Sequence, residues 1–499
     1  MKGRGKCMLK KYDFDDIDDR YDNFKRSNLG EEIDKLQRIV QRLKIPVLIL
    51  VDGWESSGKG DIINDLTREL DPRYVKVELF DSRSDVDYLH PSVWRFWQKL
   101  PSHEEVVVFD QSFYSQVMNK DERSSDKLKQ RTEELLNLEH MLLDDGTIVI
   151  KFFLHIKEKT QSKNIEALED SKFRQFLLSD NDYKQNKNYE EYLEWFDKVL
   201  KKTDVPESPW NIINAEDRKL AAKTVLGITL EEITSGIERV TLARERADKS
   251  DRKYYIEDTQ LDEFDLSKTI SDKEYDKELE ILQKEAADLV YDCYTKDIAI
   301  ITAFEGVDAA GKGGAIQRLT RHIDPRSYTI HGIKAPTDLE NSYHYLWRFW
   351  TKFPKDGDMA IFDRSWYGRV LVERIEGFAS ESEWERAYDE INHTEKVLTD
   401  HGSIVMKFFM YIDEDEQKER FEDRQEEPDK NYKITEDDWR NRSQWDEYIA
   451  AYEEMLDRTH TANAPWYIVA TNQKKFARIE VLKHFINHIK EHLSELPES

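Results

Sequence analysis

The chain has few cysteines, no long apolar segment and too little positive charge to balance its acids. Only two cysteines occur among the 499 residues, Cys7 and Cys293, which excludes a disulfide framework and a cysteine-rich zinc site. No apolar run approaches the roughly 20 residues that cross a membrane, and the basic N-terminus lacks the apolar stretch of a secretory signal. These absences favour a reducing, cytoplasmic setting.

Negative charge dominates the composition, with a formal net charge of −27. Nucleic acids and anionic membranes are polyanions, so this balance argues against binding to either. With 38% hydrophobic and 36% charged residues, the composition is typical of a folded, soluble protein. A chain of this length is too long for one ordinary core, so two or more domains are expected.

The second half of the sequence repeats the first. A shift of 253 residues aligns GWESSGKGD, which begins at Gly53, with GVDAAGKGG, which begins at Gly306, and it also aligns two WRFW motifs. Further along, the shift becomes 256. We interpret the repeat as a duplicated domain. The first copy is predicted at 1–242, a charged linker at 243–271 and the second copy at 272–499.

Each copy alternates short apolar segments with helical ones. The apolar segments are PVLILVDG, VKVELF, VVVFD, TIVIKFFLHI and WNII in the first copy, and IAIITAFEG, YTIHGI, MAIFD, SIVMKFFMYI and WYIV in the second. Such a pattern predicts an α/β fold, in which a parallel sheet is flanked by helices on both faces. Ligands are then expected beyond the carboxyl ends of the strands, where the glycine-rich loop and the strand-terminal Asp363 both lie.

The glycine-rich loop of the second copy looks like a phosphate-binding (Walker A) loop without its usual hydroxyl. In that motif Ser or Thr follows the lysine and helps to hold Mg²⁺, whereas Gly313 follows Lys312 here. Backbone N–H groups of such a loop bind phosphate oxygens at a helix N-terminus, and the lysine adds a positive charge. Phosphate contacts are therefore expected from Lys312 and from the loop residues Gly306, Ala309, Ala310, Gly311 and Gly313.

Two aspartates are candidates to replace the missing hydroxyl as metal ligands. Asp308 lies inside the loop, and Asp363 ends a strand at the same edge of the predicted sheet. Carboxylate oxygens suit Mg²⁺, and phosphoryl-transfer enzymes use an acidic residue in this position. We therefore expect Asp308 and Asp363 to organise Mg²⁺ at the transferred phosphate. The alternative role for Asp308 is to cap the loop.

Arginines follow at two places where phosphoryl groups are expected. Arg364 and Arg369 come directly after Asp363, and the planar guanidinium forms bidentate hydrogen bonds with phosphoryl oxygens. Arg420 and Arg424 follow the KFFMYI strand and share one helical face, where related enzymes carry a lid that supplies arginines. Ordinary solvated ion pairs would give much the same sequence pattern at either place.

The first copy has lost most of these groups. It carries Glu55 for Asp308, Gln111 and Gln116 for Arg364 and Arg369, and Asn164 and Leu168 for Arg420 and Arg424. Stabilising phosphoryl transfer is mainly an electrostatic task, and the loss of one arginine costs about 10³-fold or more in rate. We therefore expect the first copy to be catalytically weak or inactive.

The second copy resembles the polyphosphate kinase 2 family. The motifs that carry the resemblance are FEGVDAAGKGGAIQRLT, KAPTD, YLWRFW, IFDRSWYGRVLVERIEGF, KFFMYI, ERFEDR and APWYIV. They are spread along the whole second copy, which makes the match far more specific than a lone Walker-type loop. The tandem arrangement looks like the two-domain polyphosphate:AMP phosphotransferases of that family, and the resemblance extends more weakly into the first half.

The resemblance implies tandem P-loop kinase domains with a helical lid. It further implies Mg²⁺-dependent transfer of the terminal phosphoryl group of inorganic polyphosphate to AMP, giving ADP, with the C-terminal domain active. The catalytic positions would be Asp308, Lys312, Asp363, Arg364 and Arg369, and the lid would bind phosphate through Arg420, Arg424, Lys430 and Lys433. Pro336, Thr337 and Asp338 are expected near the nucleotide, and a homo-oligomer is expected because family members commonly form one.

Two other functions remain open at this point. One is an ATP-dependent nucleotide kinase on the same fold, since the residues alone do not name the phosphoryl donor. The number of candidate lysines and arginines leans toward polyphosphate, because it exceeds what one nucleoside triphosphate requires. The other is a non-catalytic sensor of nucleotide or phosphate, against which the complete arginine set of the second copy argues.

Overall fold

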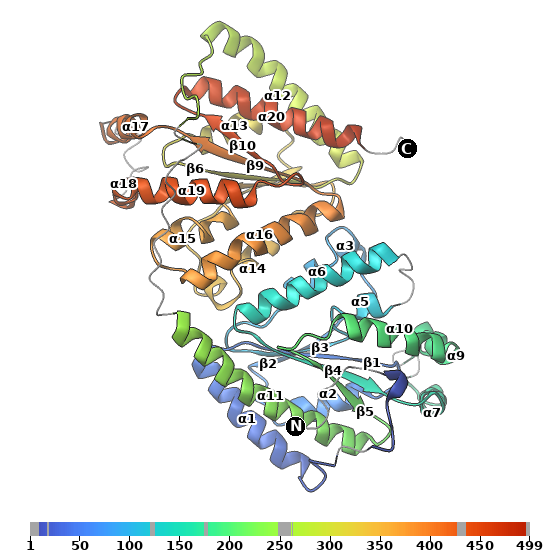
Figure 1. Ribbon diagram of the computed structural model, residues 1–499. Coiled ribbons are helices and arrows are strands. Elements are labelled where there is room, and N and C mark those ends of the chain that lie inside the picture. The colour runs from blue at the N-terminus through green and yellow to red at the C-terminus, as the bar shows by residue number, and fades with distance from the viewer. Residues whose placement is uncertain are drawn as a thin grey trace. The chain divides into compact units, whose positions relative to one another are not determined.

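The computed structural model describes residues 9–16, 19–119, 125–173, 178–247, 261, 263–426 and 436–495 (Figure 1). The described residues divide into two compact units. One unit lies within Met1–Arg83, Arg95–Arg246 and Asn341–His344, and the other within Ser84–Trp94, Ala247–Glu340 and Tyr345–Ser499. Part of the predicted linker, at 248–260 and 262, lies outside the described residues, as do Lys430 and Lys433.

The strands form where the apolar segments predict them. In the first sheet they are β1 (Val47–Gly53), β2 (Val75–Leu79), β3 (Val106–Asp110), β4 (Ile148–His155) and β5 (Trp210–Asn214). In the second sheet they are β6 (Ile300–Gly306), β7 (Tyr328–Gly332), β8 (Met359–Asp363), β9 (Ile404–Tyr411) and β10 (Trp466–Ala470). All pairings between these strands are parallel.

The two sheets have the same topology. Their strand orders are β2-β3-β1-β4-β5 and β7-β8-β6-β9-β10, so the strand that enters the glycine-rich loop is central in both. Every residue of β6 is buried, which explains its nearly continuous apolar sequence. The central position of β6 brings the loop next to the end of β8, where Asp363 lies. The predicted α/β class with parallel sheets is confirmed.

Helices cover both faces of each sheet (Figure 1). In the N-terminal half they are η1 (Leu9–Lys11), α1 (Arg26–Leu43), α2 (Lys59–Thr67), α3 (Asp85–Tyr88), α4 (Trp94–Trp97), α5 (Ser115–Met118), α6 (Ser125–Asp144), α7 (Glu158–Glu169), α9 (Asp180–Lys187), α10 (Tyr189–Lys202) and α11 (Arg218–Ala247). In the C-terminal half they are α12 (Asp272–Thr295), α13 (Lys312–Leu319), η2 (Glu340–Ser342), α14 (Trp347–Trp350), η3 (Trp366–Arg369), α15 (Val372–Ile375), α16 (Glu381–His401), α17 (Glu414–Glu426), α18 (Glu436–Ser443), α19 (Trp445–Thr459) and α20 (Lys474–Ser494). On the second sheet, α12 and α20 lie on one face, and α16 and α19 lie on the other.

The duplication extends to unusual backbone conformations. Ala309 and Arg364 have φ values of 64° and 63°, and the aligned Ser56 and Gln111 have 56° and 63°. Few residues other than glycine adopt this left-handed region, and they tend to do so at functional sites. In each copy one such residue lies in the glycine-rich loop, and the other directly follows the strand-terminal aspartate. The backbone of the site is therefore retained in both copies, although the side chains differ.

Candidate active site

The loop of the second copy has a backbone that requires glycine. Gly306 ends β6 with φ +130°, and a Cβ there would lie 2.1 Å from the carbonyl oxygen of Met410. Gly311 caps α13 in the left-handed conformation, with φ 102°. The chain thus passes from a buried strand through a tight loop into a helix that begins at Lys312. In this arrangement backbone N–H groups at the helix N-terminus attract anions.

The loop forms one wall of a cavity of about 640 Å³. Its lining residues are Asp308, Ala309, Ala310, Gly311, Lys312, Gly313, Gly314, Gln317, Arg318, Asp363, Arg364 and Arg424. The cavity lies at the carboxyl ends of β6 and β8, where an α/β sheet usually binds its ligand. The fold therefore brings the loop, both candidate metal-binding aspartates and two candidate arginines to a single cavity.

Asp308 is paired with Arg364 across the mouth of the loop. Arg364 Nη2 donates a hydrogen bond of 3.0 Å to Asp308 Oδ1. Burial by itself raises the pKa of the Asp308 carboxyl, but the charges of Lys312 and Arg364 outweigh it and hold the pKa below its usual range. Asp308 in turn raises the pKa of Arg364. The loop aspartate is therefore an ionised carboxylate, which is the form that holds a divalent cation.

Lys312 lies at the base of the loop with its ammonium group on backbone oxygens. Its Nζ donates to the carbonyl of Gly306 at 2.7 Å and to that of Val307 at 3.4 Å. It forms no ion pair with a carboxylate of the described residues within 4.0 Å. Burial lowers the pKa of Lys312, and the positive charge of Arg364 adds to this effect, while Asp308 and Asp363 act against it. A partly buried cation that is compensated only in part favours an incoming anion.

The lid helices α17 and α18 also reach the loop. Asn441 of α18 donates to Asp308 Oδ2 at 3.1 Å, and Gln417 of α17 donates to the Asp308 carbonyl at 3.3 Å. Both oxygens of the Asp308 carboxylate are therefore held, one by Arg364 and one by Asn441. Neither Asn441 nor Gln417 was expected from the sequence. The only sequence signal is that polar amides, Gln161 and Gln185, occupy the same places in the first copy.

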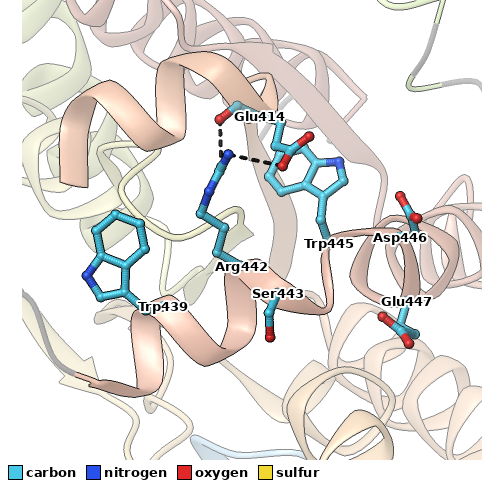
Figure 2. A pocket seen from close by; sticks show the side chains of 7 residues that line it. All are labelled: Glu414, Trp439, Arg442, Ser443, Trp445, Asp446 and Glu447. Atoms are coloured by element: carbon cyan, nitrogen blue, oxygen red, sulfur yellow. Dashed lines mark hydrogen bonds and ion pairs between the residues drawn. The ribbon is translucent and has the colours of Figure 1, made fainter. Parts of the chain in front are cut away.

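Arg442 joins the two lid helices, as Figure 2 shows. It donates to the Glu414 carbonyl at 2.7 Å and to Gln417 Oε1 at 3.1 Å, and it pairs with the Glu414 carboxylate. A hollow of about 470 Å³ lies beside it, lined by Glu414, Trp439, Arg442, Ser443, Trp445, Asp446 and Glu447. This hollow shares no residue with the loop cavity. Arg442 is therefore connected to the loop indirectly, through its hydrogen bond to Gln417.

The two predicted lid arginines have different surroundings. Arg420 is only 4% exposed, and its guanidinium donates to the carbonyls of Ala309, Thr471 and Asn472 and to Glu416. Arg424 lines the loop cavity and forms no ion pair or hydrogen bond with another described residue. Arg420 thus supports the back of the loop, whereas Arg424 offers a free cation to the cavity. Contact of either residue with phosphate stays a prediction.

Arg369 and the predicted nucleotide segment do not line the loop cavity. Arg369 pairs with Glu373 at 3.1 Å and lies 4.5 Å from the ring centre of Tyr345, and its buried Nε has no hydrogen-bond partner among the described residues. Thr337, after β7, caps the turn to Glu340 through three hydrogen bonds and is exposed, as is Asp338. The roles predicted for Arg369, Pro336, Thr337 and Asp338 stay predictions.

A buried carboxylate directly precedes each loop, and sequence reasoning did not use it. Glu305 Oε1 accepts hydrogen bonds from the backbone N–H and the hydroxyl of Ser365, at 2.6 and 2.7 Å. Burial raises the pKa of Glu305, despite Ser365 and nearby cations. The aligned Asp52 makes the same contacts with Ser112, and burial raises its pKa to about 6. The sequence did contain a signal for this carboxylate, because each copy has an acidic residue inside an otherwise apolar strand.

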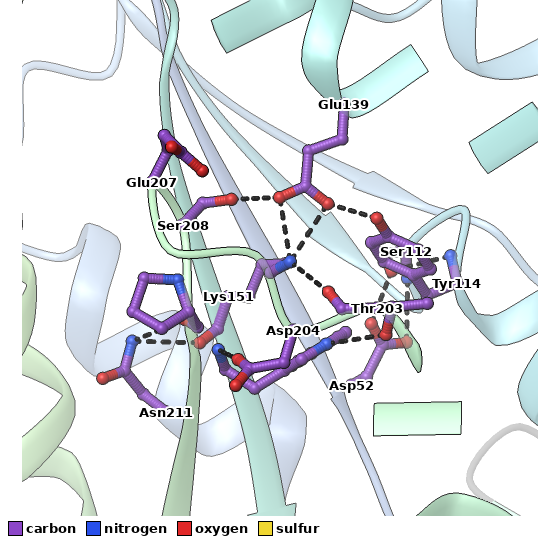
Figure 3. A network of polar contacts seen from close by, with 12 residues as sticks. Asp52, Ser112, Tyr114, Glu139, Lys151, Thr203, Asp204, Glu207, Ser208 and Asn211 are labelled. Carbon is purple, nitrogen blue, oxygen red and sulfur yellow. Dashed lines mark hydrogen bonds and ion pairs between the residues drawn. The ribbon is translucent and has the colours of Figure 1, made fainter. Parts of the chain in front are cut away.

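The lysine of each KFF motif is structural. Lys407 Nζ is completely buried and donates to Glu395, to Tyr367 and to the Thr459 carbonyl, at 2.7, 2.9 and 2.7 Å. In the first copy Lys151 makes the matching contacts with Glu139 and the Thr203 carbonyl, as Figure 3 shows. A charge buried this deeply needs a full set of partners, so the motif stabilises the sheet and does not take part in the chemistry.

The buried glutamate beside this lysine, Glu395 in the second copy and Glu139 in the first, has a different hydrogen-bond donor in each copy. In the second copy Trp366 Nε1 donates to Glu395 Oε1, at 3.0 Å. Phe113 occupies that place in the first copy and has no N–H, but Ser208, where the second copy has Ala464, donates to Glu139 Oε1 instead (Figure 3). Glu139 Oε1 also accepts from Lys151 at 2.8 Å, and Glu395 Oε1 also accepts from Tyr367 at 2.7 Å, so this oxygen has two donors in each copy. The first copy has therefore kept its core satisfied while its site changed.

The described residues limit how a metal ion could be held. Within them, no group of three or more His, Cys, Asp and Glu side chains is arranged to hold a metal without a substrate. Magnesium in phosphoryl-transfer sites takes only one or two carboxylates, with water and phosphate as the other ligands, so Asp308 and Asp363 fit that ion.

None of the helices described here is long and apolar enough to cross a membrane.

Known proteins similar to this chain are consistent with these features. The model of the polyphosphate kinase 2 family matches residues 16–239 and 269–497. A polyphosphate:AMP phosphotransferase of Pseudomonas syringae pv. tomato is 39% identical over 453 residues, which cover 89% of this chain and 90% of the relative. One from Pseudomonas aeruginosa is 40% identical over 451 residues, with the same coverage.

A solved structure shares the fold over nearly the whole length. A crystal structure described as a polyphosphate kinase 2 from Pseudomonas aeruginosa PA01 matches with a TM-score of 0.83 at 36% identity. The match covers 96% of this chain and 97% of that chain. The resemblance seen in the sequence motifs therefore extends over both halves.

Proposed function

The chain belongs to the polyphosphate kinase 2 family, and on that premise we propose that it is a polyphosphate:AMP phosphotransferase. It moves the terminal phosphoryl group of inorganic polyphosphate to AMP and releases ADP. The observation that carries this function is the loop cavity of the second copy, which combines a phosphate loop with Lys312, two carboxylates and Arg364. Relatives that carry this name are 39% and 40% identical over 89% of the chain.

The charge around the loop supports a long polyanion as donor. A second cavity of about 290 Å³ shares Ala309, Ala310, Gly311, Gly314 and Arg424 with the first, and its further charged lining residues are Arg420, Lys474, Arg478 and one acid, Asp423. In a chain with a net charge of −27, this local concentration of cations is informative. The first copy has Leu168 and Ala222 at the places of Arg424 and Arg478. We infer that the donor chain continues from the loop past Arg424 toward Lys474 and Arg478.

Magnesium would be held by Asp308 and Asp363 together with the phosphates. When bound, it would neutralise the negative charge that builds up on the transferred phosphoryl group. The chain's own residues would supply the rest of the electrostatic stabilisation. Lys312 and the loop N–H groups would bind the donor oxygens, and Arg364, which lines the cavity, would stabilise charge on the transferred group.

The acceptor would bind on the other side of the transferred group. Pro336, Thr337 and Asp338 follow β7, the edge strand next to β8, so they lie at the end of the sheet where the site is. Arg369, on η3, has an unpartnered buried N–H among the described residues and would contact the phosphate of AMP. The second copy would carry the activity, because the first lacks the matching arginines.

A donor assay tests this function directly. The chain is incubated with AMP, Mg²⁺ and polyphosphate in the absence of ATP, and ADP is measured. ADP formation supports the proposal. ADP formation with ATP alone, and none with polyphosphate, would establish an ATP-dependent nucleotide kinase instead. Tight AMP binding without turnover from either donor would establish a sensor. Parallel reactions with ADP or GMP as acceptor define the specificity.

Two further expectations concern the state of the protein in the cell. We infer a homo-oligomer from the family resemblance, and light scattering of the purified chain measures its mass. A monomer at the concentration used for activity would contradict this inference. We also infer a reducing, cytoplasmic location from the scarcity of cysteine, together with the burial of Cys293. Fractionation of cells followed by immunodetection tests the location.

A further inference from the structure

The phosphate loop of the first copy contains a carboxylate that reaches the loop lysine. Glu55 Oε2 forms an ion pair with Lys59 Nζ at 2.9 Å, and Glu55 Oε1 accepts a hydrogen bond from Gln111 at 3.2 Å. Lys59 is the phosphate-loop lysine of this copy, and it is only 8% exposed. Both oxygens of Glu55 therefore engage groups whose counterparts in the second copy, Lys312 and Arg364, face the cavity.

The second copy shows why one methylene matters. Asp308 stands at the position of Glu55, and its shorter side chain pairs with Arg364 and Asn441 but makes no ion pair with Lys312. Lys312 bonds to backbone carbonyls instead, and the net effect on its pKa is a decrease, led by burial. Burial also acts to lower the pKa of Lys59, but Glu55, with Asp110, more than reverses it. Lys59 is therefore neutralised by the carboxylate of Glu55, whereas Lys312 has no such ion pair with Asp308.

The lid helices of the first copy hold the same loop by other contacts. Gln185 of α9 accepts a hydrogen bond of 2.9 Å from the backbone N–H of Glu55, which removes one donor that would face an anion. Asp182, also on α9, accepts from the Ser56 hydroxyl, and Asn164 of α7 donates to the Ser56 carbonyl at 2.8 Å. These contacts pair polar groups of the loop at Glu55 and Ser56, while the buried Ser57 hydroxyl has no hydrogen-bond partner among the described residues.

A third lid helix, α10, is attached through an aromatic pair. Trp54, the residue before Glu55, is fully buried and stacks on Tyr189 of α10, with ring centres 4.1 Å apart and planes 8° apart. Valine replaces this tryptophan in the second copy, at Val307. The loop and lid of the first copy are therefore packed together around Trp54 and Glu55, and this packing holds the carboxylate in place over Lys59.

We propose that the first loop is a phosphate site already occupied by its own Glu55 carboxylate, which excludes polyphosphate and other phosphate anions from it. The loop backbone and the lysine that bind phosphate are retained, and the occupant is a side chain of the same chain. The first copy is thus closed to ligand as well as short of arginines. Shortening Glu55 is expected to open the site. The inference rests on the geometry of the first copy and does not depend on the activity proposed for the second.

Calorimetric titration of the full-length chain with inorganic tripolyphosphate, without Mg²⁺, tests the proposal. The comparison uses the parent, Lys59→Ala, Glu55→Ala, Glu55→Asp and the double variant Glu55→Ala with Lys59→Ala. We expect Lys59→Ala to bind as many tripolyphosphates as the parent. Glu55→Ala and Glu55→Asp should each gain one site per chain, and the double variant should lose it again. The gain is counted relative to the parent, so it is readable even if the second copy binds nothing.

Two results would overturn the proposal. One is a parent chain that already loses a tripolyphosphate site on Lys59→Ala, because the first loop would then be open. The other is the absence of any gained site in both Glu55 variants. Thermal unfolding of each variant accompanies the titration. If Glu55→Ala unfolds, Glu55→Asp decides the question, since it keeps the charge and copies the residue of the second loop.

Chemical labelling of lysine gives an independent readout. In the parent, Lys59 should react slowly with an amine reagent and tripolyphosphate should not change its rate. In Glu55→Asp the reaction should be faster, and tripolyphosphate should slow it several-fold, as mass spectrometry of the Lys59 peptide would show. Protection of Lys59 by tripolyphosphate in the parent would contradict the proposal. The reciprocal variant, Asp308→Glu, should weaken tripolyphosphate binding at the second loop at least tenfold.

Discussion

Arg364 Nη2 lies 3.0 Å from Asp308 Oδ1 and joins the turn after β8 to the phosphate loop. The backbone of Arg364 has φ 63°, and the backbone N–H of this residue bonds to the Phe304 carbonyl of β6. This unusual conformation directs the side chain over the loop. The first copy has the same backbone at Gln111 but no guanidinium, so the Arg364–Asp308 pair is a feature of the second copy alone.

Replacement of this arginine tests its role in catalysis. Arg364→Gln copies the first domain and is expected to lower kcat by about 10³-fold or more, because one guanidinium that stabilises phosphoryl transfer has that effect. The fold should be unchanged, since Gln111 occupies the same backbone conformation in the first copy. Steady-state kinetics with polyphosphate and AMP measure the effect. Arg326→Gln is the matched control, because Arg326 is an exposed arginine outside the cavity.

The metal role of Asp308 can be separated from loop capping. Asp308→Asn keeps the size of the side chain and one of its two acceptor oxygens, but it replaces the other oxygen by a donor and removes the charge that would hold Mg²⁺. Turnover is expected to fall about 100-fold or more, with a higher Mg²⁺ concentration needed for half-maximal rate. Rates measured across a Mg²⁺ series provide the check. Near-normal activity and an unchanged Mg²⁺ dependence would leave Asp308 with the capping role alone.

The two phosphate-loop lysines are a matched pair within one chain. Lys312→Ala is expected to abolish turnover, because the cation that faces the loop cavity is lost. Lys59→Ala should leave most turnover intact, since Lys59 is paired with Glu55 in the copy that lacks the arginines. The ADP-forming assay with polyphosphate and AMP compares both variants with the parent. The reverse pattern would move the active site to the first copy.

The buried Lys407–Glu395 pair predicts a change in stability. Lys407→Met leaves the Glu395 carboxylate buried without its cation, and both side chains are at most 1% exposed. The expected loss is about 3–5 kcal/mol, whereas a double replacement by Met and Gln should cost less, because it also removes the charge of Glu395. Denaturant unfolding monitored by tryptophan fluorescence measures both variants. Equal losses for the single and double variants would show that charge burial is not the cause.

The Asp52 carboxyl predicts a pH dependence. Burial raises its pKa from the ordinary 3.8 to about 6, so between these values the folded chain retains a proton that the unfolded chain releases. The contribution of Asp52 to stability therefore falls as pH rises through this window, by about 3 kcal/mol in total. Asp52→Asn cannot lose a proton, so its stability relative to the parent should increase between pH 4 and pH 7. Unfolding midpoints across that range test the sign.

Much of the site could be predicted from the sequence, because the backbone conformation of a loop depends on the residues of that loop. The loop residues Gly306 and Gly311 have positive φ values that glycine tolerates, and a lysine follows them at the helix start. Alternating apolar segments placed Asp363 at the end of a strand, and strand order then brought it beside the loop. The internal repeat indicated which charges differ between the copies, because Glu55 and Gln111 align with Asp308 and Arg364.

The hydrogen-bond partners of the polar side chains could not be predicted from the sequence in this way. Arg420 and Arg424 share a helical face by spacing, yet Arg420 is bound to carbonyls behind the loop and Arg424 lines the cavity. Asn164, which the sequence indicated as a lost charge, donates to the Ser56 carbonyl as Arg420 donates to that of Ala309. Helical spacing defines a face but not the distance to a loop more than 100 residues away in sequence.

The sequence by itself determined the duplicated α/β fold, the position of each loop and the loss of arginines from the first copy. The fold follows from apolar periodicity, and the loops follow from the glycines that their backbone requires. The loss of arginines follows from the alignment of the two copies. Only the tertiary structure decided that Glu55 reaches Lys59, while the shorter Asp308 pairs with Arg364 and leaves Lys312 on backbone carbonyls. The physical reason is that a hydrogen-bonded ion pair forms only within a narrow range of distance, so that one methylene group can make or break it.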